Sequence, residues 1–553
     1  MCLHPEPIQP VPTETARVAR AAFPHGHPYL TLRDEFGTFF TDGQFRALFP
    51  SRGRAAEAPW RLALVTLLQF AEGLSDRQAA DAVRARLDWK YLLGLELTDA
   101  GFHHSRLGEF RDRLGQAGAE VLLFEALLEQ FRQRHLLKAR GKQRTDATHI
   151  LAAVRLLNRL EMVGETVRHA LNTVAEVAPA WLRAHLQPAW GERYAHRFEE
   201  ARLPREAAER QSLALAIGAD GFHLLTALYA PETPEPLRAL PAVQALREIW
   251  LQQYYRAETD RGAELRWRAH EDLPPAPQRL LSPYDAEARY GKKRDTVWLG
   301  YKRHYTETCE PDQPLLLTDV HTTNALEVDS ATLPHIQAAL ERRNLLPAEQ
   351  YVDAGYVDAH TLVESATRYG IQLLGPAPLD TAWQSRAGAG FAAADFTIHW
   401  EEEWAECPRG QRSQTWGTRQ ERGQPIVQVR FARETCRACP CRSDCTRARG
   451  AGRWLTLRPA AEHVALQAAR SRQETPGFRA AYPLRSGIEG SHSQAVRRCG
   501  GRRSRYIGAV KTQVQHVLTA AALNLVRVAA WLLATPRART RTSAFARLVA
   551  VAI

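Results

Sequence analysis

Apolar residues recur every three or four positions in the first quarter of the chain, and this spacing predicts helices. One helix covers 60–73, a capping box formed by Ser75 and Gln78 begins the next, and a third runs through 106–114. We therefore predict an all-α N-terminal domain. It is either a helix-turn-helix that binds DNA or a small bundle that serves packing or dimerisation, and periodicity does not distinguish the two.

Strand-like runs and helices alternate after residue 141, and this alternation predicts an α/β sheet. The first strand ends near Asp146. A long helical tract at 152–280 then interrupts the pattern, as an insertion would. The later strands are expected at 296–308, 314–323, 349–357 and 371–376, with a helix before each of the last two.

The pattern becomes irregular and β-like around a group of cysteines, before helices return near the C-terminus. The most apolar stretch, 517–534, contains Asn524 and Arg527, so we interpret it as an amphipathic helix rather than a membrane span. We find no internal repeat. The expected division is an N-terminal extension at 1–40, the helical domain at 41–138, an α/β catalytic core at 139–155, 281–374 and 480–535, a helical insertion at 156–280, a β-rich insertion at 375–479 and a basic tail at 536–553.

The N-terminus, MCLHPEPIQPVPTE, has no basic start followed by an apolar stretch, so we expect no secretory signal and a cytoplasmic location. The eight cysteines should then be reduced. The net charge is +12 and the pI is near 9.5, with seven Lys among the 73 basic residues. This balance indicates a polyanionic partner, either nucleic acid or an acidic membrane surface.

Three carboxylates are candidates for catalysis. Asp146 and Asp353 are each expected at a strand end, where a side chain can leave the sheet and enter a shared cleft. Glu489 lies between Gly487 and Gly490, which are poor helix formers and would let DNA approach. Two Asp and one Glu can hold two divalent ions for phosphodiester chemistry, and such hard ligands favour Mg²⁺ or Mn²⁺.

Each carboxylate also has a purely structural interpretation. An Asp at a strand end is commonly a turn former or a helix cap, and Ser486 and Glu489 have the spacing of a capping box. Asp319 and Asp358 lie on or near predicted strands and could replace Asp353, although the order of the strands favours Asp353.

A strongly basic segment surrounds the glutamate. Residues 485–511 carry a net charge of +6, with Glu489 as their one acid. A solvated basic face is the usual explanation of such a run, but a single carboxylate within it suits an acid beside a phosphate backbone. The basic residues are Arg485, Arg497, Arg498, Arg502, Arg503, Arg505 and Lys511.

These motifs resemble those of DDE transposases of bacterial insertion sequences. Tyr482-x-x-Arg485-x-x-x-Glu489 is similar to the family's third motif, in the branch where the Glu begins the last catalytic helix. TDATHI and YVDAGYVD look like the other two motifs, and GYKRHYTETCE and SRYIGAVKTQVQHVLTAAALNLVR resemble a cysteine-bearing group of these enzymes. The family often has Lys where this chain has Val496, so Arg497 and Lys511 are candidates for that phosphate contact.

The resemblance implies a ribonuclease H-like core that binds two Mg²⁺ or Mn²⁺ ions at Asp146, Asp353 and Glu489. It implies metal-dependent cleavage at terminal inverted repeats and transfer of the 3′-hydroxyl end into target DNA. The partner is double-stranded DNA, bound by a homodimer that associates with the bacterial nucleoid. Tyr482 and the basic residues of 485–511 are the expected DNA contacts. His149, His304, His492 and His516 are expected to form hydrogen bonds rather than to act as bases.

The cysteine segment has the composition of a structural zinc site. Cys436-x-x-Cys439-x5-Cys445 and the earlier Cys407 provide four thiolates, with Cys441 inside the motif. Zinc would fold a region that is too polar to hold itself, and the alternative is reduced thiols without a metal. The surrounding arginines would then form a patch that faces DNA, namely Arg433, Arg437, Arg442, Arg447 and Arg449.

Two other functions remain open at this point. One is a non-enzymatic, zinc-bearing regulator that binds DNA through the basic segment and the N-terminal helices. The other is a ribonuclease H-like nuclease that cuts DNA without joining it.

Overall fold

The computed structural model describes residues 2–5, 7–116, 118–260, 262–293, 295–387, 390–421, 423–537, 544 and 548. The predicted basic tail at 536–553 therefore lies almost wholly outside the described residues.

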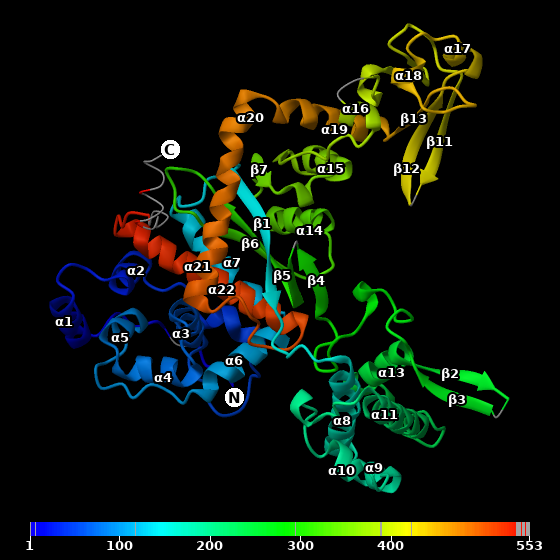
Figure 1. The fold of residues 1–553 in the computed structure, drawn as a ribbon. Coiled ribbons are helices and arrows are strands. Elements are labelled where there is room, and N and C mark those ends of the chain that lie inside the picture. The colour runs from blue at the N-terminus through cyan, green and yellow to red at the C-terminus, as the bar shows by residue number, and fades with distance from the viewer. Residues whose placement is uncertain are drawn as a thin grey trace.

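A mixed β-sheet forms the centre of the molecule (Figure 1). β1 pairs antiparallel with β5 and parallel with β7, and β7 continues the sheet to β8 in parallel. β4 and β6 pair with successive parts of β5, both antiparallel. This arrangement confirms the predicted ribonuclease H-like α/β core. The strands are β1 (Lys142–Leu151), β4 (Arg289–Lys293), β5 (Thr296–Thr308), β6 (Leu317–Asn324), β7 (Glu349–Val352) and β8 (Gln372–Leu374).

Helices cover the sheet. α14 (Asp329–Arg342) and α15 (Ala359–Tyr369) connect its later strands, as predicted. The C-terminal part of the chain adds η6 (Tyr482–Gly487), α21 (Ile488–Cys499) and α22 (Ala509–Leu532). The Asn524 side chain of α22 forms two hydrogen bonds with the backbone of β6. It accepts from the Leu317 N–H and donates to the Leu317 carbonyl, both at 2.8 Å.

The interpretation of 517–534 as an amphipathic helix was wrong in one respect. α22 is buried almost all round between residues 514 and 525, because it lies between the sheet and the N-terminal helices. Its polar residues find partners inside the protein rather than in water: Arg527 pairs with Glu307 of β5 at 2.9 Å.

The N-terminal region is helical, as predicted, and its capping box at Ser75 forms. Two further helices occur inside the stretch expected to be an extension, and Tyr29, Leu32 and Phe36 of the second pack into the main core. That core is continuous from these helices through the sheet to α22. The helices are α1 (Thr13–Ala22), α2 (Pro28–Phe36), α3 (Pro59–Glu72), α4 (Asp76–Ala85), α5 (Leu87–Leu93), α6 (Ser105–Gln116) and α7 (Glu120–Gln133), with a 3-10 turn η1 (Asp42–Leu48).

The first insertion is a lobe with its own apolar core, which contains Trp190 and Trp250. It is not wholly helical as expected, because β2 (Tyr254–Thr259) and β3 (Gly262–Trp267) form a projecting hairpin (Figure 1). Its helices are α8 (Arg159–Val177), α9 (Pro179–His185), α10 (Trp190–Tyr194), α11 (Ala207–Leu228), α12 (Glu235–Arg238) and α13 (Pro241–Gln253), with 3-10 turns η2 (Glu200–Arg202) and η3 (Ala276–Gln278).

The cysteine-bearing insertion is a second lobe, and Figure 1 shows it projecting from the core apart from the first. A small apolar cluster forms its own core. Its elements are α16 (Trp383–Ala387), η5 (Ala393–Asp395), β9 (Thr397–His399), β10 (Trp404–Glu406), β11 (Thr415–Glu421), β12 (Gln424–Arg430), α17 (Arg433–Arg437), α18 (Arg442–Cys445) and β13 (Trp454–Leu457), and α19 (Ala460–Gln473) and α20 (Pro476–Ala481) lead back to the core.

Within the described ranges, no helix combines the length and the apolar character needed to cross a membrane.

Candidate functional site

Asp146 and Asp353 become neighbours where β7 ends. β1 and β7 pair in parallel up to Thr145 and Val352, so the next residue of each chain segment is one of the two Asp. The expectation that Asp146 ends a strand was wrong, because the pairing of β1 with β5 continues to Leu151. Asp146 is thus held by regular strand geometry, and Asp353 begins the 3-10 turn η4 (Ala354–Tyr356).

A third segment, η6, is fastened across the ends of both strands. The Arg144 guanidinium of β1 donates a hydrogen bond to the Leu484 carbonyl at 2.7 Å. The Tyr482 hydroxyl donates to the Val352 carbonyl at 3.2 Å. Gly487 lets the end of η6 pass close to Arg144, since a Cβ atom there would lie 1.9 Å from the Arg144 Nη1 and the guanidinium would have to move. These contacts bring the start of α21 to the two Asp.

The capping box considered for Ser486 and Glu489 does not form. The Ser486 hydroxyl donates to the Pro483 carbonyl at 2.8 Å, and α21 begins at Ile488. Glu489 is therefore in the first turn of α21, and its side chain is largely exposed.

Arg485 contacts all three candidate carboxylates. Its Nη2 lies 2.9 Å from Asp146 Oδ2 and 3.5 Å from Asp353 Oδ2. Its Nη1 lies 2.8 Å from Glu489 Oε1. The three acids, which come from separate segments of the chain, thus converge on one guanidinium.

The electrostatics of the site differ between the acids and the arginine. Burial raises the pKa of Asp146 to about 6, although Arg485 opposes this effect. Burial lowers the pKa of Arg485, but the neighbouring Asp146 and Asp353 outweigh it and the net shift is upward.

A buried ionic network around Glu307 connects the strand that carries Asp146 with the helix that carries Glu489. Glu307 of β5 is fully buried, and it pairs with Arg144 at 2.6 Å and with Arg527 at 2.9 Å. Ser491 of α21 donates a hydrogen bond to the same carboxylate. Sequence reasoning missed Arg144 and Glu307, and the available signal was the presence of charged residues within otherwise strand-like runs.

The two alternative acids have other partners. Asp319 is buried on β6, where it pairs with Arg343 at 2.6 Å. Asp358 caps the N-terminus of α15 and accepts a hydrogen bond from the Thr361 N–H at 2.8 Å. Neither contacts Arg485 in the described part of the chain.

The basic residues from the last turn of α21 to Lys511 divide into those that contact other parts of the protein and those without an ion pair. Arg498 and Arg505 make tertiary contacts, the first with the Ala71 carbonyl at 2.7 Å and the second with the Phe70 ring. Arg502 binds the His149 carbonyl at 2.9 Å, and Lys511 lies 3.8 Å from Asp112. Arg497 and Arg503 are exposed and have no ion pair within the described residues.

The histidines near the site were expected to form hydrogen bonds. His304 contacts the Tyr356 hydroxyl at 2.6 Å, and His516 contacts the Thr322 hydroxyl at 2.7 Å. His149 contacts Arg502 at 3.1 Å. His492 differs, because it stacks on Tyr305 and neither ring nitrogen has a partner within the described structure.

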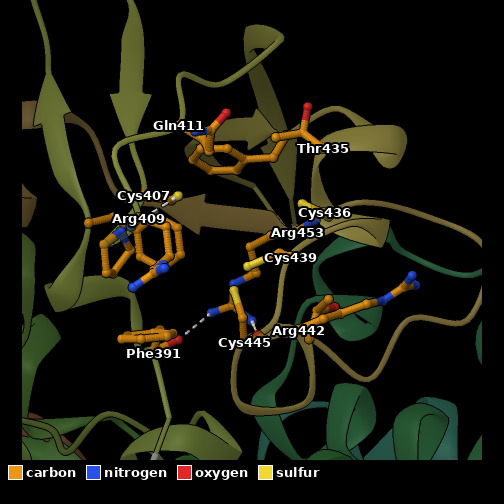
Figure 2. A pocket seen from close by; sticks show the side chains of 14 residues that line it. Phe391, Cys407, Arg409, Gln411, Thr435, Cys436, Cys439, Arg442, Cys445 and Arg453 are labelled. Atoms are coloured by element: carbon orange, nitrogen blue, oxygen red, sulfur yellow. Dashed lines mark hydrogen bonds between the residues drawn. The ribbon is translucent and has the colours of Figure 1, made fainter.

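Four of the five clustered cysteines line one pocket in the second lobe. Figure 2 shows Cys407, Cys436, Cys439 and Cys445 around it. Cys441 is not among the lining residues. All eight cysteines are free in the structure.

The sulfur atoms of the pocket lie close together, and two of them accept backbone hydrogen bonds. Cys407 Sγ accepts from the Arg409 N–H and Cys436 Sγ from the Arg453 N–H, both at 3.4 Å. Burial raises the pKa of Cys445 to about 11, and the three neighbouring thiols contribute to the rise. Four sulfur donors are a set that zinc accepts.

As placed in the described residues, no group of three or more His, Cys, Asp or Glu side chains is arranged to hold a metal ion. At the carboxylates, the Arg485 guanidinium lies between the three acidic side chains. The donor set itself fits a hard divalent cation, because it consists of three carboxylates that face one small region.

Two family models match the chain. The model described as "Transposase DDE domain" matches residues 406–529, a range that includes Glu489 and the five clustered cysteines but neither Asp146 nor Asp353. The model described as "Transposase domain (DUF772)" matches residues 17–113, which include most of the N-terminal helices. No curated protein matches the chain.

Proposed function

We propose that this chain, which belongs to the DDE transposases of insertion sequences, cuts DNA at the terminal inverted repeats of its element and joins the 3′-hydroxyl ends to target DNA. As a transposase it is a nucleic-acid-processing enzyme that binds DNA, and DDE domains generally use divalent metal ions. The observation that carries the proposal is the convergence of Asp146, Asp353 and Glu489 at one place.

These three carboxylates are the groups that would hold two Mg²⁺ or Mn²⁺ ions. When bound, the ions would activate the attacking oxygen and stabilise the leaving oxygen of an in-line displacement. The protein keeps the donors in position: Asp146 is held within β1 and Glu489 on α21, and the buried network of Glu307, Arg144 and Ser491 joins the two elements.

DNA binding is assigned to the basic segment and to η6. Arg497 and Arg503 are the strongest candidates for phosphate contacts, since both are exposed and lack an acidic partner in the described residues. Arg498, Arg502 and Arg505 would contribute charge while fastening the segment to the core. The remaining assigned contacts are Tyr482, Arg485 and Lys511.

We extend the proposal to the domains and the assembly. The helical region at 41–138 would bind DNA or mediate dimerisation, and the enzyme would act as a homodimer on DNA. In the second lobe, Cys407, Cys436, Cys439 and Cys445 would hold a structural zinc ion and present a basic surface to DNA.

Substitution of each carboxylate tests the catalytic assignment. Asp146→Ala, Asp353→Ala and Glu489→Ala should each reduce Mg²⁺-dependent cleavage of terminal-repeat DNA to background while the protein stays folded. Asp358→Asn is the matched control, because Asn also caps helices and Asp358 serves as a cap. Cleavage that survives the three Ala substitutions would refute the site.

A strand-transfer assay separates transposition from simple cutting. The cleaved ends should appear covalently joined to target DNA. If ends are cut but never joined under any divalent metal, the enzyme is a nuclease and the joining step of the proposal is wrong.

A further inference from the structure

We infer that Arg485 is a positioning residue that makes metal binding depend on DNA. In the DNA-free protein its guanidinium holds the three carboxylates together and occupies their oxygens, and a DNA phosphate that binds Arg485 releases them. This inference rests on the proposed function, because it takes Asp146, Asp353 and Glu489 as the metal ligands.

The oxygens of both Asp side chains are already engaged. Asp146 Oδ1 accepts the Ala147 N–H at 2.8 Å, and Asp353 Oδ1 accepts the Ala354 N–H at 2.7 Å. Both Oδ2 atoms face Arg485 Nη2, at 2.9 and 3.5 Å. Mg²⁺ requires ligand oxygens at about 2.0–2.1 Å, and the two Asp oxygens without a backbone hydrogen bond are the Oδ2 atoms that Arg485 now contacts.

Arg485 is also held firmly in this position. Its side chain is 15% exposed, and it is the one cation that contacts all three acids among the described residues. A guanidinium and a divalent cation repel each other at such separations. The two therefore compete for the same carboxylates.

A phosphate group offers Arg485 an alternative partner. Its Nε is buried and has no hydrogen-bond acceptor within the described structure, so the guanidinium has donor capacity that the carboxylates leave unused. Guanidinium groups bind phosphate oxygens bidentately. The side chain of Glu489, which contacts Arg485, is 65% exposed, so this edge of the site is open to a ligand from solvent.

Two consequences follow from this competition. DNA should raise the affinity of the protein for a divalent cation, and the cation should raise the affinity for DNA by the same factor, because coupling between two sites is reciprocal. A factor of about ten lies within the usual range of such coupling. The free enzyme would thus carry little bound metal, and the site would load once DNA is in place.

The test is a Mn²⁺ titration of the full-length protein, in which electron paramagnetic resonance measures free Mn²⁺. It is performed without DNA and with a short duplex of the element end that has a phosphorothioate at the cleavage position. For the wild type, the duplex should tighten Mn²⁺ binding about tenfold. Without DNA, Arg485→Gln should bind Mn²⁺ about tenfold more tightly than the wild type and respond little to the duplex.

Two further variants control for folding and for charge. Arg343→Gln removes a guanidinium that also bridges two carboxylates, Asp319 and Glu125, and is similarly shielded at 12% exposure. It should leave Mn²⁺ affinity unchanged. Arg485→Lys keeps the charge but loses the planar fork, so its Mn²⁺ affinity should fall between those of the wild type and Arg485→Gln.

The inference is overturned if Arg485→Gln binds Mn²⁺ no more tightly than the wild type, or if the duplex does not change the wild-type affinity. Such a result leaves the proposed function intact provided that the three carboxylate variants still abolish cleavage. If those variants retain cleavage, it is the proposed function that fails.

Discussion

At the scale of single residues, the candidate site depends on close contacts around Arg144. This arginine fixes the Leu484 carbonyl and pairs with the buried Glu307, so its guanidinium has little freedom to move. Gly487 passes directly over it, and Gly490, one helical turn away, faces open space. The two glycines that flank Glu489 therefore serve different purposes.

Substitution of Gly487 tests this difference. Gly487→Ala should destabilise the fold by about 1–3 kcal/mol, the usual cost of overpacking, and should lower cleavage because η6 shifts away from Asp146. Gly490→Ala should leave the fold unchanged or stabilise it by up to about 1 kcal/mol, since Ala is the better helix former. Thermal unfolding followed by circular dichroism measures both. Equal melting temperatures for the two variants would contradict the packing argument.

At the scale of elements, α22 acts as part of the core rather than as a surface helix. It packs on β6 and on the N-terminal helices α3 and α7, and it carries buried polar residues along its length. Asn524 satisfies both backbone groups of Leu317. Strand β6 is thereby anchored to a helix that comes much later in the sequence.

Removal of that side-chain amide should be costly. Asn524→Leu would leave the Leu317 N–H and carbonyl without these partners in a buried place, which should destabilise the protein by about 2 kcal/mol or more. Val510→Leu on the exposed part of the same helix should change stability by less than about 0.5 kcal/mol. The midpoint of urea unfolding gives the comparison, and similar midpoints for the two variants would show that Asn524 is not an anchor.

At the scale of the whole molecule, two lobes with separate apolar cores project from a common core that joins the sheet, α22 and the N-terminal helices. The cysteine lobe has a small apolar cluster, so a bound zinc ion would supply much of its stability. Loss of the ion should therefore affect this lobe and leave the carboxylate site in place.

Metal analysis and proteolysis test the zinc proposal with a matched pair of cysteines. The purified protein should contain about one zinc ion per chain. Cys439→Ser should lose it and expose residues 397–457 to proteolysis, whereas Cys441→Ser should retain it, because Cys441 does not line the pocket. Protease-sensitive bonds in the main core should stay protected in both variants. A folded, protease-resistant lobe without metal would refute the zinc site.

Short-range sequence patterns predicted most of the core helices and strands and the α/β class, since periodicity and capping act over a few residues. They also singled out Glu489 as a candidate, because Tyr482, Arg485 and Glu489 lie within one short segment. The sequence patterns did not predict helices α1 and α2, because both are short and lie in a Pro-rich segment.

Only the tertiary structure decided how the distant segments meet. Asp146 was expected at a strand end, but strand length depends on pairing with β5, which is more than a hundred residues away in the sequence. The burial of α22, the network around Glu307 and the position of Arg485 among three acids likewise arise from long-range packing. The sequence thus determined which groups are available for chemistry, and the fold determined which of them touch, because periodicity carries no information about contacts between remote segments.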